Sequence, residues 1–223
     1  MRDILSRIAP AAPKLRVERI TVRMDLGGGW TSDRLLSGML YARCMSLGGW
    51  LQERLFERRI VLITGHLDDG AAARAAAALL ALDAGGERPI DLHLDSPDGA
   101  LGAAFVLIDT AEMLRSALRV LCRGQVGGPV IGVIAAADHR AASPHARFHL
   151  SQPTARFAGT PEEIAAQSRQ QQELLWKLYG RLARRTGHPA EEIAEDMRRG
   201  RYLDAREALD YGLIDQITPG SQP

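Results

Sequence analysis

The chain has 223 residues, 46% of them hydrophobic, which suffices for the core of one domain with an extension. Its 28 basic and 27 acidic side chains nearly cancel, so no charge excess points to nucleic acid or an anionic membrane as a partner. No apolar run approaches the ~20 residues of a membrane span, and the N-terminus has no continuous apolar signal core. These features predict a cytoplasmic protein.

Cys44 and Cys122 are the two cysteines. They are too few for a metal cluster, and two reduced thiols are the expected state in the cytoplasm, although the sequence leaves a single disulfide open. We therefore expect neither a metal nor a cofactor.

Residues 1–49 contain several glycines and prolines, which interrupt regular structure. We therefore expect this segment to be an N-terminal extension of the domain. Within it, apolar and polar residues alternate over Val17–Met24, which predicts a short strand. The extension could gate a pore or dock a partner, and a partly ordered tail is the alternative.

Residues 50–217 predict a single α/β domain, followed by a short tail at 218–223. Strands rich in β-branched and apolar residues alternate with helices, which is typical of a parallel sheet. The predicted strands are Arg59–Gly65, Ile90–Leu94, Leu118–Cys122 and Arg147–Leu150, and the predicted helices are Gly70–Ala84, Gly99–Leu114 and Gly127–Ala137.

A long helix is predicted over Pro161–Arg185, with Thr160 as its N-cap and Glu163 completing a capping box. An apolar stripe of Ile164, Leu174, Leu175, Leu178 and Leu182 follows it, and Gly187 and Pro189 end it. Two more helices, Ala190–Arg199 and Asp204–Tyr211, and a strand at Leu213–Ile217 complete the predicted domain.

Four motifs, over Asp95–Gly99, Gly124–Val130, Pro144–Pro153 and Arg201–Asp215, give the chain a resemblance to the proteolytic subunit of the Clp protease. The resemblance runs from Trp50 to Ile217. It implies a crotonase-like fold, a repeated ββα superhelix, with the Pro161–Arg185 helix as a handle between two heptameric rings. It also implies active subunits of the same family, further copies of this chain, or a Clp ATPase as partners.

The resemblance also locates the three positions of the family's catalytic triad. They are Gly128 for the serine nucleophile, Ser151 for the histidine base and Gly200 for the orienting aspartate. A gapless alignment from Pro144 would place Val126 at the nucleophile instead. In either alignment no residue of the triad is present, and acyl transfer by this family needs all three.

The oxyanion hole that the resemblance implies is also altered. One backbone donor of the family falls on Pro129, which has no N–H. The other falls on Asp98, whose negative side chain would disfavour a neighbouring oxyanion. We therefore expect a catalytically inactive subunit with a structural or regulatory role in ring assembly.

Two other hypotheses remain open at this stage. One is a serine endopeptidase with a non-standard site built from Ser151 and His149 or from Ser143 and His145, with Asp196 or Asp138 as the carboxylate. His149 lies two residues before Ser151, on the same face of the predicted strand, although a structural role for it is the alternative. The other is a crotonase-like protein that binds an acyl-thioester, against which Pro129 argues.

Three arginines mark the expected ring interface. In the family, an acid and an arginine precede the catalytic aspartate and pair across the two rings, whereas this chain has Arg198 and Arg199 there. Arg156 adds a third positive charge near the same surface. Like charges would oppose the docking of identical rings. Neutralisation by Glu195 or Asp196 is the alternative.

Overall fold

The computed structural model describes residues 47–219. The strand expected at Val17–Met24, most of the expected extension and the last four residues lie outside this range. The proposed division into an extension, a domain and a tail therefore remains a prediction.

Within residues 47–219, seven strands form one sheet that is mostly parallel. Its main path runs β1-β2-β3-β4-β7, and every neighbouring pair along it is parallel. This confirms the α/β class expected from the alternation of strands and helices. The strands of this path are β1 (Ile60–Thr64), β2 (Ile90–Ser96), β3 (Leu118–Gly127), β4 (His139–Ala142) and β7 (Gln216–Ile217).

Strand β3 is longer than the sequence predicts, because it has different partners at its two ends. It pairs with β4 over Arg119–Cys122 and with β5 (Arg147–Leu150) over Gln125–Gly127. The backbone hydrogen bonds to β5 keep the chain extended through Gly127. The helix expected from Gly127 is therefore replaced by a 3₁₀ turn, η2 (Gly128–Val130), and a short helix, α5 (Ile131–Ala136).

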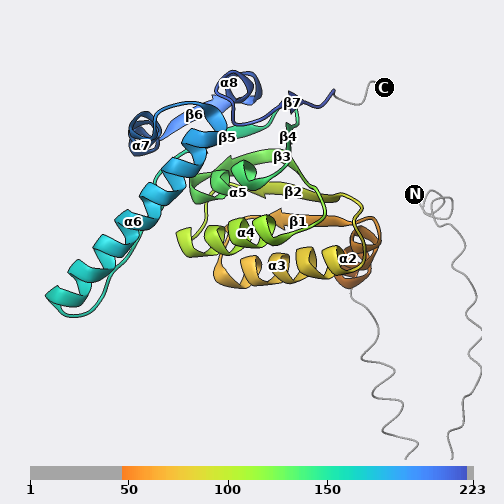
Figure 1. Ribbon diagram of the computed structural model, residues 1–223, viewed down its shortest axis with the longest axis horizontal. Coiled ribbons are helices and arrows are strands. Elements are labelled where there is room, and N and C mark those ends of the chain that lie inside the picture. Colours follow the sequence, from red (N-terminus) through yellow and green to blue (C-terminus); the bar gives the residue numbers. More distant parts are fainter. Residues whose placement is uncertain (1–46, 220–223) are drawn as a thin grey trace, which may run out of the picture. The chain divides into compact units, whose positions relative to one another are not determined.

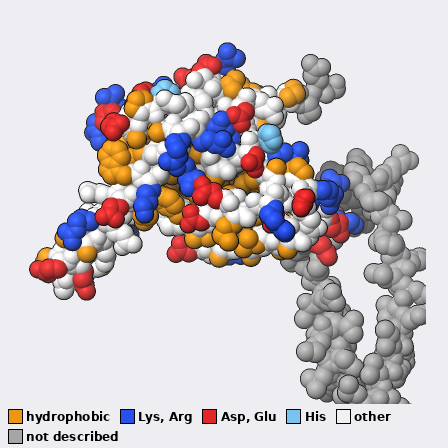
Figure 2. Space-filling view, viewed as in Figure 1, with side chains coloured by type: hydrophobic (Ala, Val, Ile, Leu, Met, Phe, Trp, Pro, Cys, Tyr) orange, Lys and Arg blue, Asp and Glu red, His pale blue; other side chains and the backbone are white. Residues whose placement is uncertain are grey.

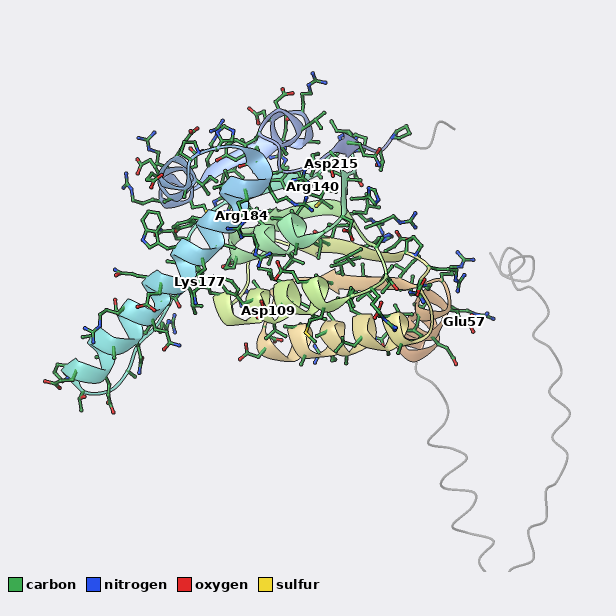
Figure 3. All side chains as sticks on the ribbon, in the orientation of Figure 1. Glu57, Asp109, Arg140, Lys177, Arg184 and Asp215 are labelled. Atoms are coloured by element: carbon green, nitrogen blue, oxygen red, sulfur yellow. The ribbon has the colours of Figure 1, made fainter. Side chains whose placement is uncertain are left out.

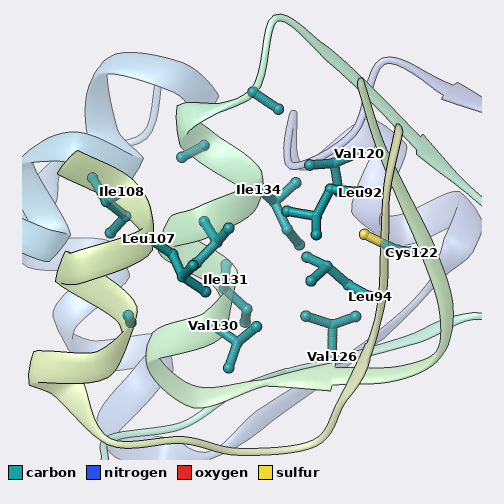
Figure 4. Packing of buried hydrophobic residues seen from close by; sticks show 14 of the residues in the cluster. Leu92, Leu94, Leu107, Ile108, Val120, Cys122, Val126, Val130, Ile131 and Ile134 are labelled. Carbon is teal, nitrogen blue, oxygen red and sulfur yellow. The ribbon is translucent and has the colours of Figure 1, made fainter. Parts of the chain in front are cut away.

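The core lies between the sheet and the helices α3 (Asp69–Ala84), α4 (Leu101–Met113) and α5 (Figure 1). Leucine, valine and isoleucine side chains from β2, β3, α4 and α5 meet there, as Figure 4 shows. The small alanine side chains on the buried face of α3 allow this helix to lie close to its neighbours in the core. The fully buried members that Figure 4 labels include Leu92, Leu94, Leu107, Ile108, Val126, Val130, Ile131 and Ile134.

The long helix α6 (Pro161–Thr186) has the predicted capping box at Thr160 and Glu163. Only its C-terminal half is packed against the core, where Leu178 and Leu182 are buried. The N-terminal half projects from the sheet and its helices (Figure 1), so Ile164 is exposed instead of belonging to a buried stripe.

The remaining elements are short. Helix α2 (Leu47–Glu57) precedes β1, and α7 (Ala190–Arg199) has the predicted bounds. Strand β6 (Arg201–Asp204), which the sequence did not predict, pairs antiparallel with β5. Helix α8 (Ala205–Asp210) begins after Asp204, whose side chain caps it.

Candidate active site

The three predicted triad positions lie where β3, β5 and β6 meet. In the sheet, His149 of β5 is paired with Gly127 of β3 on one side and with Tyr202 of β6 on the other. Gly128 directly follows Gly127. Continuing the Leu150–Arg201 pairing by one residue sets Ser151 opposite Gly200. The fold therefore brings Gly128, Ser151 and Gly200 to the same end of these three neighbouring strands.

At Gly128 the space for a side chain is already occupied. The backbone has a φ of +54°, in the left-handed region that favours glycine. A Cβ atom added there would lie 2.5 Å from Oδ1 of Asp98. That carboxylate also accepts a hydrogen bond from the N–H of Gly99 at 2.8 Å. The Asp98 side chain thus occupies the space that the side chain of a serine at position 128 would need.

The backbone around Asp98 is fixed by further hydrogen bonds. Its carbonyl oxygen accepts from the N–H of Leu67 at 3.0 Å and from the hydroxyl of Ser96 at 3.1 Å. Ser96 is fully buried, and Asp98 is partly buried. These contacts fix the backbone that carries the carboxylate next to Gly128.

Gly127 is required by close packing, which was not predicted from the sequence. A Cβ atom there would collide with the carbonyl oxygen of Pro97 and would lie 3.1 Å from Cβ of His149. The glycine doublet was the available signal, because adjacent glycines at a strand end often mark close backbone approach.

Pro129 is buried in the first turn after β3. Proline suits this position, because the first turn of a helix has no partner for the missing N–H. Because proline has no N–H, Pro129 also leaves the turn that follows Gly128 with one backbone donor fewer than another residue would.

The imidazole of His149 points toward Gly200. It stacks on the ring of Tyr202, with 4.0 Å between ring centroids and 5° between planes. A Cβ atom added at Gly200 would lie 3.4 Å from Nε2 of His149. A side chain at position 200 would therefore contact this ring.

The substitute set Ser151, His149 and Asp196 is not joined by hydrogen bonds in the described part of the chain. Oδ2 of Asp196 instead accepts from Arg201 at 3.1 Å and from the Tyr211 hydroxyl at 3.0 Å. Burial, followed by this hydrogen bond, raises the pKa of Tyr211. The carboxylate thus supports the junction of α7, β6 and α8.

The other substitute set, Ser143, His145 and Asp138, also lacks connecting hydrogen bonds between residues 47 and 219. Oδ2 of Asp138 accepts from the N–H of Leu118 at 2.7 Å, at the start of β3. This aspartate therefore anchors a strand.

The expected ring-interface arginines are partly neutralised within the chain. Arg198 donates two hydrogen bonds of 2.7 Å to Glu195, and Arg199 donates one of 2.6 Å to the same carboxylate. The bonds from Arg198, then from Arg199, lower the pKa of Glu195 to about 2. Arg156 is exposed and has no ion pair with another described residue.

Residues 47–219 contain no group of three or more His, Cys, Asp or Glu side chains placed to hold a metal ion. Cys122 is a buried free thiol, and burial raises its pKa. None of the helices in this range has the length and hydropathy needed to cross a membrane.

The arrangement defines an α/β protein in which Gly128 stands at the position predicted for the nucleophile. A model of the Clp protease family matches residues 49–221. The chain is also 34% identical over 170 residues to the ATP-dependent Clp protease proteolytic subunit 3 of Rhodococcus jostii (strain RHA1), covering 75% of this chain and 84% of that protein. The chain belongs to the Clp protease family.

Proposed function

We propose that this chain is a catalytically inactive subunit of a Clp protease complex. The observation that carries the proposal is the Asp98 carboxylate beside Gly128, 2.5 Å from where a nucleophile's Cβ would stand. A glycine has no group to attack a carbonyl, and a carboxylate at the same place repels a developing oxyanion.

The expected loss of activity is large. Removing the triad of a serine protease lowers turnover by roughly 10⁶-fold. Loss of one oxyanion donor, as at Pro129, lowers it by roughly another 10²–10³-fold. An enzyme with both defects would have no useful proteolysis left.

The subunit acts instead through assembly. Members of this family form oligomeric rings, and the projecting half of α6 supports a handle role for that helix. The partners are active subunits of the same family or further copies of this chain, with a Clp ATPase as a further candidate. The site of action is the cytoplasm.

A peptidase assay tests the proposal. The purified full-length chain should cleave neither short fluorogenic peptides nor casein faster than buffer alone. An active Clp proteolytic subunit from the same cell serves as the positive control. A rate above buffer that persists through a second purification would refute the proposal.

No contact within residues 47–219 favours the two alternative functions. Asp196, the acid of the substitute triad, is held by Arg201 and Tyr211. An acyl-thioester site needs two backbone donors, one of which Pro129 removes. A thermal shift on adding coenzyme A would reopen the second alternative.

A further inference from the structure

Several arginines within residues 47–219 are held by a carboxylate. Figure 2 shows acidic and basic side chains interspersed over one face of the molecule. Figure 3 labels one such pair, Arg140 and Asp215, which form an ion pair where β4 and β7 meet. Contacts of this kind persist over a wide pH range, because arginine and aspartate are both ionised near neutral pH.

His93 and Arg123 form a contact of a different kind. Nη1 of Arg123 lies 3.4 Å from Nδ1 of His93. A guanidinium has only donors, so the imidazole nitrogen must be the acceptor in this contact. The contact therefore requires a neutral His93 whose proton is on Nε2.

Both side chains lie on the face of the sheet opposite the core. On β2, Leu92 and Leu94 are fully buried, and His93 between them points to the other face, where it is partly buried. In the sheet register His93 lies between Leu62 of β1 and Leu121 of β3. Neither leucine side chain can hydrogen-bond the imidazole or stabilise a charge on it.

The charged groups around His93 on this face come from β2 and β3. Asp91, two residues before His93, accepts two hydrogen bonds of 2.7 Å from Arg119. Asp95, two residues after it, accepts from the N–H of Gln125 at 3.0 Å. Strand β1 has no titratable side chain. With a neutral histidine, the two aspartates of β2 and the two arginines of β3 therefore balance.

Burial and the neighbouring guanidinium both favour the neutral imidazole. Burial is the larger cause that lowers the pKa of His93 from its ordinary value of 6.5, and the charge of Arg123 lowers it further. Asp91 acts in the opposite direction, but Arg119 already holds its carboxylate. Proton uptake by His93 is thus expected at a more acidic pH than for an exposed histidine.

We propose that His93 and Arg123 form an acid-sensitive switch on the outer face of the sheet. A proton taken up from solvent binds Nδ1 of His93, which removes the acceptor and places two positive groups side by side. The guanidinium then leaves the imidazole, and the charge that β2 and β3 present on this face changes from balanced to positive. The switch is independent of whether the chain is catalytically active.

Nuclear magnetic resonance of the full-length chain, with isotope-labelled histidine and arginine side chains, tests this proposal. The chain has six histidines, and the signal of His93 is identified by its loss in His93→Gln. That signal should titrate at a more acidic pH than the signal of an unstructured histidine peptide, and the neutral form should carry its proton on Nε2. The side-chain N–H signal of Arg123 should move with the same midpoint.

Substitutions of the neighbouring charges should move the midpoint in opposite directions. Arg123→Gln removes the adjacent positive charge and should raise the midpoint of His93 by roughly 0.5 pH units, as expected for a charge about 4 Å away in a mostly aqueous setting. Asp91→Asn removes the attractive charge and should lower the midpoint. Arg206→Gln on α8 is the matched control, since this exposed arginine pairs with Asp210 and should leave the midpoint unchanged. Circular dichroism of each variant checks that it is folded.

Any of four results would overturn the proposal. They are a His93 midpoint equal to that of the peptide, a neutral imidazole that carries its proton on Nδ1, an unchanged midpoint in a folded Arg123→Gln variant, and an Arg123 signal that does not follow the titration of His93. The last result would show that the guanidinium is not released.

Discussion

Two adjacent glycines at the end of β3 differ in what their missing side chains permit. Gly127 allows the backbone of Pro97 and the side chain of His149 to approach β3. Gly128 allows a left-handed turn and leaves its side-chain space to Asp98. The first glycine is needed for packing, whereas the second stands at the position predicted for the nucleophile.

Substitution at Gly127 should destabilise the fold. Gly127→Ala would force a methyl group against the Pro97 carbonyl and should lower the free energy of unfolding by about 1–3 kcal/mol. Gly180→Ala is the control, since it lies inside α6 with open space and should raise that free energy by about 0.5–1 kcal/mol. Urea denaturation measures both. Equal stability of the two variants would show that the close approach at Gly127 is not rigid.

Restoring the triad alone should not restore proteolysis. The variant G128S/S151H/G200D would regain three side chains, but Pro129 still lacks an N–H and Asp98 still crowds position 128. We expect cleavage of a fluorogenic peptide to stay far below that of an active family member. A rate approaching that of the active subunit would mean that Pro129 does not occupy the oxyanion position.

The sequence assigned Asp98 to the oxyanion hole but did not predict that its carboxylate contacts the side-chain position of Gly128. Its side chain turns toward Gly128 because the Gly99 N–H binds it and the Leu67 N–H fixes its backbone. Leu67 is distant in the sequence and reaches this loop only through tertiary folding. Such a placement is not encoded in a local pattern.

At the scale of elements, helices were predicted better than short strands. The capping box of α6 and the bounds of α7 follow from local signals. Strands β4 and β6 have four residues each, and their sequences carry too little alternation to be recognised. They are extended because β3 and β5 pair with them, which is a long-range cause.

A buried polar network joins the end of α3 to the start of β3. Asp83 accepts hydrogen bonds from the N–H groups of Ser116 at 2.8 Å and Arg115 at 3.0 Å. Arg59 is 5% exposed and donates to the carbonyl oxygens of Leu82, Pro89 and Gly86. The bond from the Ser116 N–H is the main cause that lowers the pKa of Asp83 to about 2.

This network predicts a pH-dependent effect of Asp83→Asn. The carboxylate has a lower pKa in the folded state than in the unfolded state, so its stabilisation is present above about pH 4 and is lost as the pH falls toward 2. The variant should have a lower urea midpoint than the parent at pH 7, and the difference should shrink between pH 4 and pH 2. A difference independent of pH would show that the charge of Asp83 does not matter.

For the whole molecule, the charges near α7 bear on how rings meet. Glu195 neutralises one of the two arginines that precede Gly200, so the group keeps one positive charge. Exposed Arg156 adds another. We expect this residual charge to oppose docking between identical rings. The repulsion should be weaker than for two unpaired arginines, because Glu195 offsets one of the two charges.

Sedimentation of the full chain tests this consequence. At about 0.15 M salt, where exposed charges interact within about 8 Å, the chain alone should form a single ring or smaller species. A double ring should appear only with a partner subunit that carries acids at the contact. Glu195→Gln should weaken any double ring further, because it frees both arginines. A stable double ring of this chain alone that Arg198→Asp does not change would contradict the expectation.

The proposed inactivity requires that no serine of the chain acts as an activated nucleophile. Intact-protein mass spectrometry after treatment with a fluorophosphonate probe tests it most directly, because the probe forms a covalent adduct only with an activated hydroxyl. We expect no adduct on the purified full-length chain, while an active Clp proteolytic subunit treated in parallel is labelled. A single adduct that maps to Ser151 and disappears in Ser151→Ala would contradict it.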